Sequence, residues 1–392
     1  DVSVLTASQR IFVGMSKFSL TAIPFFILAG NLMNQGGIAK RLVDFVLAIL
    51  GKLPGSLLVT NVGANALFGA ISGSASAAAA AVGSMVREGE EEQGYDPALC
   101  AATNGASAPA GLLIPPSNAL ITYSLVSGGT SVAALFLAGY IPGIIWSACC
   151  ILVAVMIAKR NGYQGIPGKF DWQNLLCATL RAIPALSLII VVIGGIIIGV
   201  FTATEGSAIA VVYALILSIC YRSLSWKTFW HIVTDSAKMS GMIVFLIGVS
   251  NIMGWVMAFT QIPQAISAAL LGLTDNSVII LLIMNGILLI AGTFMDVTPA
   301  ILIFTPLFLP VVKTFGMSPI QFGLILVYNL CIGNITPPVG NTLFVAIKVG
   351  KTSLARVMPH MLVYYIAILA GLLLVTYVSA VSLTLPMIAG ML

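Results

Sequence analysis

The segment Asn104-Gly-Ala-Ser-Ala-Pro-Ala-Gly-Leu-Leu-Ile-Pro-Pro-Ser-Asn118 interrupts one of the long hydrophobic stretches of this sequence. Its glycines and prolines oppose an unbroken helix, because proline lacks a backbone N–H donor and glycine loses much conformational entropy when it is fixed. Inside a bilayer an unpaired backbone group costs several kcal/mol, so such a break survives only within the protein or beside a water-filled cavity. The segment therefore predicts a discontinuous helix.

A second segment of the same kind, Gly333-Asn-Ile-Thr-Pro-Pro-Val-Gly-Asn-Thr342, lies far downstream. The two regions align without a gap at an offset of 222 residues, which places Pro115-Pro116 on Pro337-Pro338 and Ser74 on Asp296. Two discontinuous helices in corresponding places are typical of the binding site of an inverted-repeat transporter. The sequence therefore predicts an internal repeat built around a paired site.

The composition indicates a polytopic membrane protein. Hydrophobic residues make up 59% of the chain and charged residues only 7%, with a mean hydropathy of +1.09, whereas soluble domains carry about 25% charged residues. The net charge of +5 does not indicate a nucleic-acid partner, because the basic residues lie at the ends of apolar segments. The six cysteines form no CxxC pair, so the sequence predicts no disulfide or metal framework.

We predict an all-α fold in which residues 1–158 form the first repeat. Two short helices joined by Ser72-Gly73-Ser74 are predicted to make a re-entrant hairpin, because neither crosses a bilayer comfortably alone. The predicted elements are a span at 19–33, an interfacial helix at 37–52, the hairpin at 55–87, the broken span at 97–127 and a return span at 131–158.

Residues 159–239 are predicted to connect the repeats, and residues 240–392 to form the second. The connection comprises a polar stretch at 159–181, spans at 182–201 and 206–221, and a cytoplasmic amphipathic stretch at 222–238. The second repeat comprises a span at 240–259, an interfacial helix at 261–275, a hairpin at 278–314, a broken span at 319–347 and a last span at 358–380. Since the chain opens at Asp1 without a methionine, we interpret it as a segment whose upstream part is missing.

The basic residues predict the orientation. If 34–54 is cytoplasmic, that side receives 14 lysines and arginines, and the other side keeps Arg10, Lys17 and Lys313. This asymmetry follows the positive-inside rule. The C-terminus is then periplasmic. The two hairpins open from opposite sides, so the repeats are predicted to be inverted.

The sequence does not predict an enzyme. Its two histidines, His231 and His360, lie near span ends, and no catalytic set can be assembled at the membrane midplane. The midplane holds hydroxyl, amide and carbonyl oxygens, which suit Na+, and helix N-termini, which attract anions. Asp296 is the only carboxylate at a hairpin tip, where it either caps a helix or attracts a cation. The predicted solute or ion contacts are Ser74, Ser107, Asn118, Asp296, Thr298, Asn334 and Asn341.

Several motifs in this order carry a resemblance to a known family. They include Leu67-Phe-Gly-Ala-Ile-Ser-Gly-Ser-Ala75, Gly94-Tyr-Asp-Pro97, Ile114-Pro-Pro-Ser117, Thr202-Ala-Thr-Glu205 and Ile335-Thr-Pro-Pro-Val-Gly340. Together they resemble the large membrane subunit (M subunit, DctM-like) of TRAP transporters, within the ion transporter superfamily. The resemblance implies a scaffold with an elevator-type transport domain in the bacterial cytoplasmic (inner) membrane. It also implies Na+-coupled uptake of an organic acid (a carboxylate or sugar acid) with a periplasmic substrate-binding protein (P type) and a small membrane subunit (Q type).

The resemblance further implies two Na+ sites. Three departures fall in the predicted solute site: Ala78 replaces a frequent acidic residue, Pro109-Ala-Gly-Leu112 replaces Thr-Ile-Gly-Pro, and Asn118 replaces an apolar residue. The substrate class therefore stays open. The implied Na+ sites are Ser72, Gly111, Ile114 and Pro116, mostly through backbone carbonyls, and Gly292, Gly333, Thr336 and Val339.

The alternative function is a stand-alone Na+- or H+-coupled carboxylate symporter of the same superfamily. A gene for a periplasmic binding protein beside this one would separate the two. An intramembrane enzyme or a structural scaffold is opposed by the missing catalytic set and by the inverted repeat.

Overall fold

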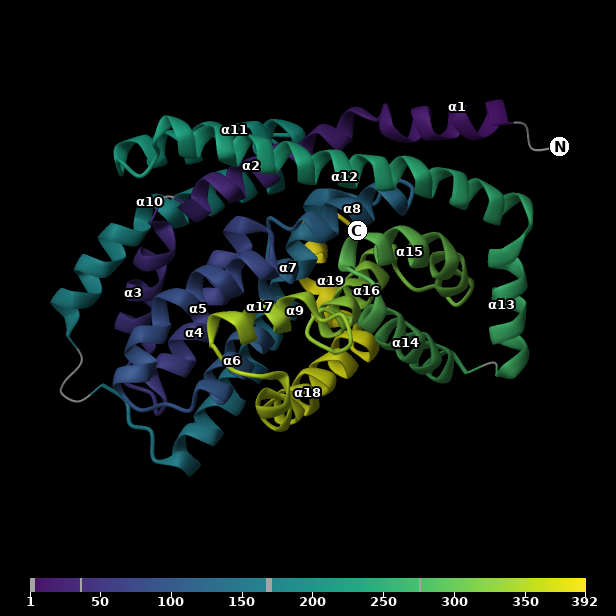
Figure 1. The fold of residues 1–392 in the computed structure, drawn as a ribbon. Helices are drawn as coiled ribbons and strands as arrows, with labels where there is room; N and C mark the ends of the chain where they lie inside the picture. Colours follow the sequence, from purple (N-terminus) through teal and green to yellow (C-terminus); the bar gives the residue numbers. More distant parts are fainter. Residues whose placement is uncertain (1–3, 36, 167–170, 275) are drawn as a thin grey trace.

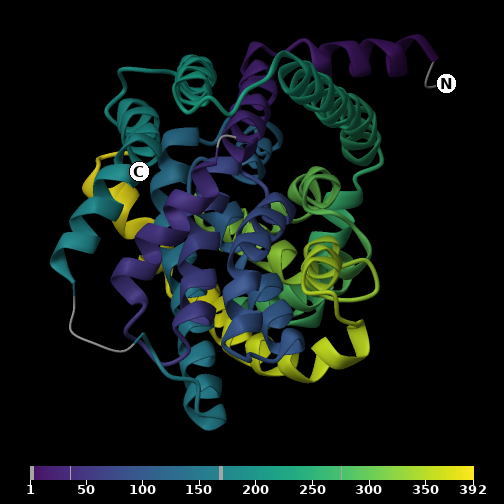
Figure 2. The ribbon, with the colours of Figure 1, turned by 60° about the vertical axis from the view of Figure 1, so that its left-hand side comes forward.

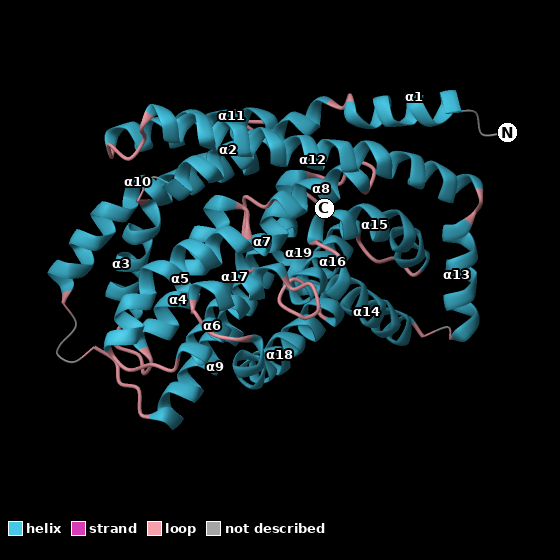
Figure 3. Ribbon diagram, viewed as in Figure 1, coloured by secondary structure: helices cyan, strands magenta, loops and turns pink. Residues whose placement is uncertain are grey.

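The computed structural model describes residues 4–35, 37–166, 171–274 and 276–392. Every regular element in these ranges is helical (Figure 3). Among them, seven helices are long and apolar enough to cross a membrane, or up to eight if the pair bent by 57° near residues 15–18 forms one span. The prediction of an all-α, multi-pass membrane protein is confirmed.

The helices fall into three successive groups along the chain. The first contains α1 (Val4–Met15), the 3-10 turn η1 (Phe18–Thr21), α2 (Ala22–Gln35), α3 (Ile38–Leu50), α4 (Ser56–Ser72), α5 (Ala75–Glu92), α6 (Pro97–Ser107), α7 (Ala110–Leu113), α8 (Asn118–Val126) and α9 (Val132–Asn161). The second contains α10 (Trp172–Ile197), α11 (Ala203–Cys220) and α12 (Trp226–Phe259). The third contains α13 (Ile262–Leu273), α14 (Ser277–Phe294), α15 (Val297–Thr314), α16 (Pro319–Gly333), α17 (Asn341–Val349), α18 (Leu354–Tyr377) and α19 (Ser379–Ile388).

The molecule consists of an outer layer of long helices against a body of shorter ones. Helices α1, α2, α11 and α12 run along one side (Figure 1), where α2 packs on α11 and α12, and α1 packs on α12. Figure 2 shows the same layer along the upper edge after a 60° turn. Helix α3 packs on α10, and α13 packs on α15. The body consists of α4 to α9 and α14 to α19.

Within the body each helical hairpin packs on a broken span. Helix α4 contacts α6 and α7, while α14 and α15 contact α16. The contacts also cross between the halves, since α17 packs on α5 and α6, and α8 packs on α15 and α16. Each broken span is therefore enclosed by elements of both halves.

Most helices of the first half have a counterpart in the second half. Helices α5 and α15 both begin and end 222 residues apart, and α9 and α18 begin 222 residues apart. The Sγ atom of Cys331 lies 3.8 Å from the carbonyl oxygen of Pro109, and these positions also differ by 222. The contact between Cys331 and Pro109 therefore brings equivalent positions of the two broken spans together.

Several helices differ from the sequence predictions. The segments 222–238 and 240–259 form the single helix α12, because Ser225 caps its start and no proline separates the polar part from the apolar part. Helix α10 begins inside the predicted polar stretch 159–181, because Asp171 accepts hydrogen bonds from the first backbone N–H groups. Helices α1 and α19 were not predicted. Gly36, Lys169 and Asp275, which belong to segments discussed from the sequence, lie outside the described residues.

Hairpin helices too short to cross a bilayer, as expected for the first hairpin, are not found in the second hairpin. Helices α14 and α15 have 18 residues each and are apolar enough to span. At 1.5 Å per residue each reaches about 27 Å, close to the roughly 30 Å of a hydrocarbon core. Helix length therefore does not distinguish a re-entrant hairpin from two spans.

A carboxyl group is buried at the end of α5, beyond the predicted hairpin segment 55–87. Glu90 is 6% exposed, and its Oε1 atom accepts no hydrogen bond from the described residues. Desolvation by burial raises the pKa of Glu90 to about 7, although the nearby Arg87 partly opposes the shift. The folded protein therefore keeps this proton to higher pH than the unfolded chain does.

This burial predicts a pH-dependent stability. Between pH 4.5, the ordinary pKa, and about pH 7, the folded state binds a proton that the unfolded state releases. The contribution of protonated Glu90 to the free energy of unfolding is therefore fully present below pH 4.5 and is lost as the pH rises through 7. Glu90→Gln is expected to stabilise the protein at pH 8 by up to about 3 kcal/mol and to have little effect below pH 5. Melting temperatures of both proteins across this range test it, with the exposed Glu88→Gln as control. Parallel pH profiles would contradict the expectation.

Candidate functional site

The first hairpin meets the first broken span through bare backbone. Helix α4 ends at Ser72, and its capping residue Gly73 has a φ of +63°, in the left-handed region that favours glycine. A Cβ atom added to Gly111 would lie 2.2 Å from the Cα of Gly69, so the two backbones touch with no side chain between them. The structure thus brings Ser72 and Gly111, two residues of the first predicted Na+ site, to the same junction.

The break itself follows directly after this contact. Ile114 leaves helix α7 in an extended conformation, and the Pro115–Pro116 peptide bond is cis. Ser117 then caps α8, because its hydroxyl accepts from the N–H of Leu120 at 3.4 Å and donates to the carbonyl of Leu112. Ile114 and Pro116, the other predicted Na+ residues of this set, therefore lie in the non-helical link between two short helices.

The second hairpin meets the second broken span in the same way. A Cβ atom added to Gly333 would lie 2.3 Å from the carbonyl carbon of Gly292. The N–H of Val339 donates to the carbonyl of Thr293 at 3.2 Å, which ties the break to the end of α14. Thr336 donates its hydroxyl to the carbonyl of Ile332 at 2.6 Å. The four residues of the second predicted Na+ site thus belong to one hairpin–break junction.

Two predicted solute contacts lie at the first junction. Ser74 caps α5 by accepting from the N–H of Ala77 at 3.3 Å. Asn118 starts α8, and a Cβ atom added to Gly73 would lie 2.9 Å from its Nδ2 atom. The Oδ1 atom of Asn118 is buried and accepts no hydrogen bond from the described residues. Because a buried acceptor without a partner costs about 1–3 kcal/mol, this atom indicates a place for a ligand donor or a cation.

Four predicted contacts lie at the second junction. Asp296 occupies the capping position of α15, but its side chain makes no capping hydrogen bond, and it is exposed. Thr298, in the first turn of α15, is half-buried. The Oδ1 atom of Asn334 accepts from the N–H of Thr342 at 3.4 Å, and Asn341 is exposed at the start of α17. Among the described residues, the Asp296 carboxylate forms neither a capping hydrogen bond nor an ion pair.

Ser107, the last residue of α6, belongs to a buried amide cluster that directly precedes the first break. The Nδ2 atom of Asn65 lies 2.9 Å from the hydroxyl of Ser107, 2.9 Å from Oδ1 of Asn104 and 2.7 Å from Oδ1 of Asn61. Nδ2 of Asn104 in turn donates to the carbonyl of Ala79 at 2.8 Å. This cluster joins α4, α5 and α6. Sequence reasoning missed it, although asparagines four residues apart on one predicted helix were the available signal.

A similar cluster occurs in the second half. Nδ2 of Asn329 donates to Oδ1 of Asn285 at 2.8 Å, and Nδ2 of Asn285 donates to the hydroxyl of Thr376 at 3.1 Å. At the offset of 222 residues, Asn329 corresponds to Ser107. Both halves therefore fasten the hairpin to the broken span by buried amides, in the part of the helix that directly precedes each break.

Comparison with known proteins places this architecture in a family. Residues 1–381 match the family described as "Tripartite ATP-independent periplasmic transporter, DctM component". The chain is 49% identical over 386 residues to the uncharacterized protein YgiK of Salmonella typhimurium, covering 98% of this chain and 88% of that one. It is 35% identical over 405 residues to the C4-dicarboxylate TRAP transporter large permease protein DctM of Rhodobacter capsulatus, covering 100% and 92%.

The fold also resembles a solved transporter. The crystal structure of the Alcanivorax borkumensis YdaH transporter superimposes with a TM-score of 0.70 over 94% of this chain and 87% of that one, at 14% sequence identity. This likeness concerns the fold alone. The family match and the sequence identities identify the chain as a member of the DctM family, the large permease component of TRAP transporters.

Proposed function

We propose that this chain is the membrane permease of a Na+-coupled importer for a small organic acid, a carboxylate or sugar acid, and that it is not an enzyme. The observation that carries the proposal is the pair of hairpin–break junctions, each closed by a glycine–glycine backbone contact, Gly69 with Gly111 and Gly292 with Gly333. The name of the Rhodobacter capsulatus relative, a C4-dicarboxylate transporter, supports an organic acid as solute.

Na+ is proposed to bind at both junctions. Each offers carbonyl and hydroxyl oxygens at a helix break, which are the ligands that unwound helices supply to Na+. The unpaired Oδ1 of Asn118 adds a further acceptor at the first junction. The solute is proposed to bind beside these ions, because α5, α8, α15 and α17 begin at the junctions and helix N-termini attract negative charge.

The transport step is proposed to be an elevator movement of the body along the layer formed by α1, α2, α11 and α12. The meeting of equivalent positions, Pro109 and Cys331, supports an inverted repeat, in which the two hairpins are proposed to be re-entrant. The proposed units are residues 1–158, 159–239 and 240–392, and both boundaries fall within helices, the first in α9 and the second in α12. The proposed location is the bacterial inner membrane, with the C-terminus in the periplasm.

Two protein partners are proposed, a small membrane subunit and a periplasmic substrate-binding protein. The three-part family description supports them. The alternative is a stand-alone symporter. Uptake that proceeds equally well without the binding protein would favour that alternative.

The coupling ion is tested by uptake into proteoliposomes that contain the permease with its small subunit, with the binding protein outside. An inward Na+ gradient is expected to drive solute uptake, and replacement of Na+ by choline is expected to abolish it. Empty liposomes serve as the control. Equal uptake in choline would refute Na+ coupling.

A further inference from the structure

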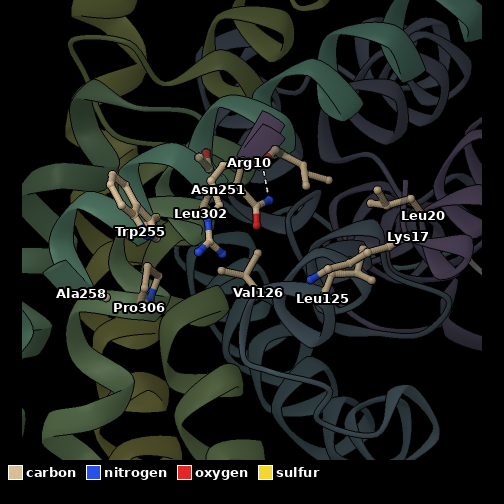
Figure 4. Close-up of a pocket in the computed structure, with 13 residues that line it drawn as sticks. Arg10, Lys17, Leu20, Leu125, Val126, Asn251, Trp255, Ala258, Leu302 and Pro306 are labelled. Atoms are coloured by element: carbon tan, nitrogen blue, oxygen red, sulfur yellow. Dashed lines mark hydrogen bonds between the residues drawn. The ribbon is translucent and has the colours of Figure 1, made fainter. Parts of the chain in front are cut away.

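A cavity lies outside the two junctions, between the layer and the body. It has a volume of about 300 Å³ and is bounded by α1 and α12 of the layer and by α8 and α15 of the body (Figure 4). Leu20, Ile247 and Leu302 form its buried apolar part. Small-molecule sites in proteins occupy about 300–1,000 Å³, so the cavity is large enough for a small organic acid.

Two basic side chains line this cavity. Arg10 projects from α1 and Lys17 precedes η1, and Figure 4 shows the charged ends of both directed toward the space beside Val126. The guanidinium carbon of Arg10 lies 5.8 Å from the ring centroid of Trp255, a cation–π distance that positions the group. Within the described part of the chain, neither side chain forms an ion pair with a carboxylate. The cavity therefore carries uncompensated positive charge.

A polar group fixed in the wall adds to this pattern. The Nδ2 atom of Asn251 donates to the carbonyl of Ile247 at 2.8 Å (dashed in Figure 4), and the side chain packs tightly against Gly14 of α1. The amide is thus held at the contact of α1 with α12, beside both basic groups. Polar groups that are few, fixed and convergent are characteristic of ligand sites.

The position of the cavity relates it to the candidate site. Helix α8 begins at Asn118, at the first junction, and reaches the cavity at Leu125 and Val126, about 12 Å further along its axis. Helix α15 begins after Asp296 and reaches it at Leu302, about 9 Å along. Two helices that start at the two junctions therefore both lead to the basic cavity.

We propose that this cavity is an outer anion site, in which Arg10 and Lys17 bind the acidic group of the solute before it passes to the hairpin–break junctions. The inference rests on the proposed function. Two cations in one cleft raise the local concentration of an anion and its association rate, and charge-assisted hydrogen bonds from arginine and lysine suit a carboxylate. Both residues lie on the side that the positive-inside rule assigns to the periplasm.

The first experiment measures uptake by the complete transporter as a function of solute concentration. Arg10→Gln and Lys17→Gln are each expected to raise KM about tenfold and to leave the Na+ dependence unchanged, and the effect is expected to shrink at high ionic strength. Lys313→Gln is the matched control, because Lys313 is the third basic residue on that side but does not line the cavity. Unchanged KM in both variants of an active transporter would overturn the inference and leave the proposed function intact.

The second experiment measures binding without transport. Trp255 lines the cavity, so its fluorescence reports on binding there. The complete permease in phosphatidylcholine nanodiscs is titrated with succinate and with gluconate up to about 10 mM, above the usual range of KM values. The Trp255→Phe variant identifies the signal of this tryptophan. We expect a saturable change that Arg10→Gln and Lys17→Gln remove. A change produced by phosphatidylglycerol in the nanodisc but by neither acid would overturn the inference in favour of a lipid headgroup, and no change at all would also overturn it. Binding of either acid by a protein that does not transport would instead refute the proposed function and the passage of solute to the junctions, and would leave the anion site itself in place.

Discussion

Replacing Gly333 by alanine is expected to destabilise the protein and to lower the initial rate of uptake at least tenfold. The added Cβ atom would lie 2.3 Å from the backbone of Gly292, which has no flexible side chain to move away. Overpacking a core typically costs about 1–3 kcal/mol, and here it separates the hairpin from the break at a proposed Na+ site. Gly111→Ala is expected to do the same at the other junction, where the added Cβ atom would lie 2.2 Å from the Cα of Gly69.

The matched control is Gly286→Ala. Gly286 lies on α14, the same helix as Gly292, but a Cβ atom added there meets nothing within 4 Å. Alanine also has the higher helix propensity, so this variant is expected to be at least as stable as the parent. Melting temperature and initial uptake rate are measured for all three variants. Parental values for Gly333→Ala and Gly111→Ala would show that the junctions do not need bare backbone.

Replacing Asn65 by leucine is the second change with a large expected effect. The substitution removes the donor shared by Asn61, Asn104 and Ser107 in a fully buried cluster. Each buried polar group left without a partner costs about 1–3 kcal/mol, so we expect a large loss of thermal stability. Ser84→Ala is the control, because the exposed hydroxyl of Ser84 bonds only to a carbonyl of its own helix.

The same experiment decides the role of Ser107, which the sequence predicted to contact solute. If Ser107 serves the cluster, Ser107→Ala lowers the melting temperature and leaves KM unchanged. If it contacts solute, the substitution raises KM and leaves the melting temperature unchanged. Melting curves and concentration-dependent uptake of this variant, measured beside those of Asn65→Leu, separate the two.

The breaks and the repeat were predictable from the sequence because proline and glycine act locally. A Pro-Pro pair such as Pro115-Pro116 or Pro337-Pro338 ends a helix. The spacing of the two pairs revealed the offset of 222 residues, which also separates α5 from α15. The glycines beside them predicted close contacts between backbones, but not which residues would meet. That Gly111 meets Gly69, and Gly333 meets Gly292, depends on tertiary packing.

Other features were not predictable because they depend on capping or on distant contacts. The polar segment at 222–238 was expected to be separate from the apolar one, but hydrophobicity changes along α12 without any residue that breaks it. The charge of Arg10 and Lys17 was evident in the sequence, whereas the cavity that they share exists only because α1 folds back along α12. Asn65 and Asn104 are 39 residues apart and are joined only by the packing of α4 on α6.

Two Na+ sites at the paired junctions are proposed to drive solute uptake. This coupling is tested most directly by the steady-state accumulation of solute in proteoliposomes with the complete transporter, at zero membrane potential and a tenfold inward Na+ gradient. Each ion then supplies about 1.4 kcal/mol, so two coupled ions predict an inside-to-outside solute ratio that approaches about 100 and falls to 1 when the Na+ gradient is collapsed. A ratio that does not change when the Na+ gradient is collapsed would contradict the account.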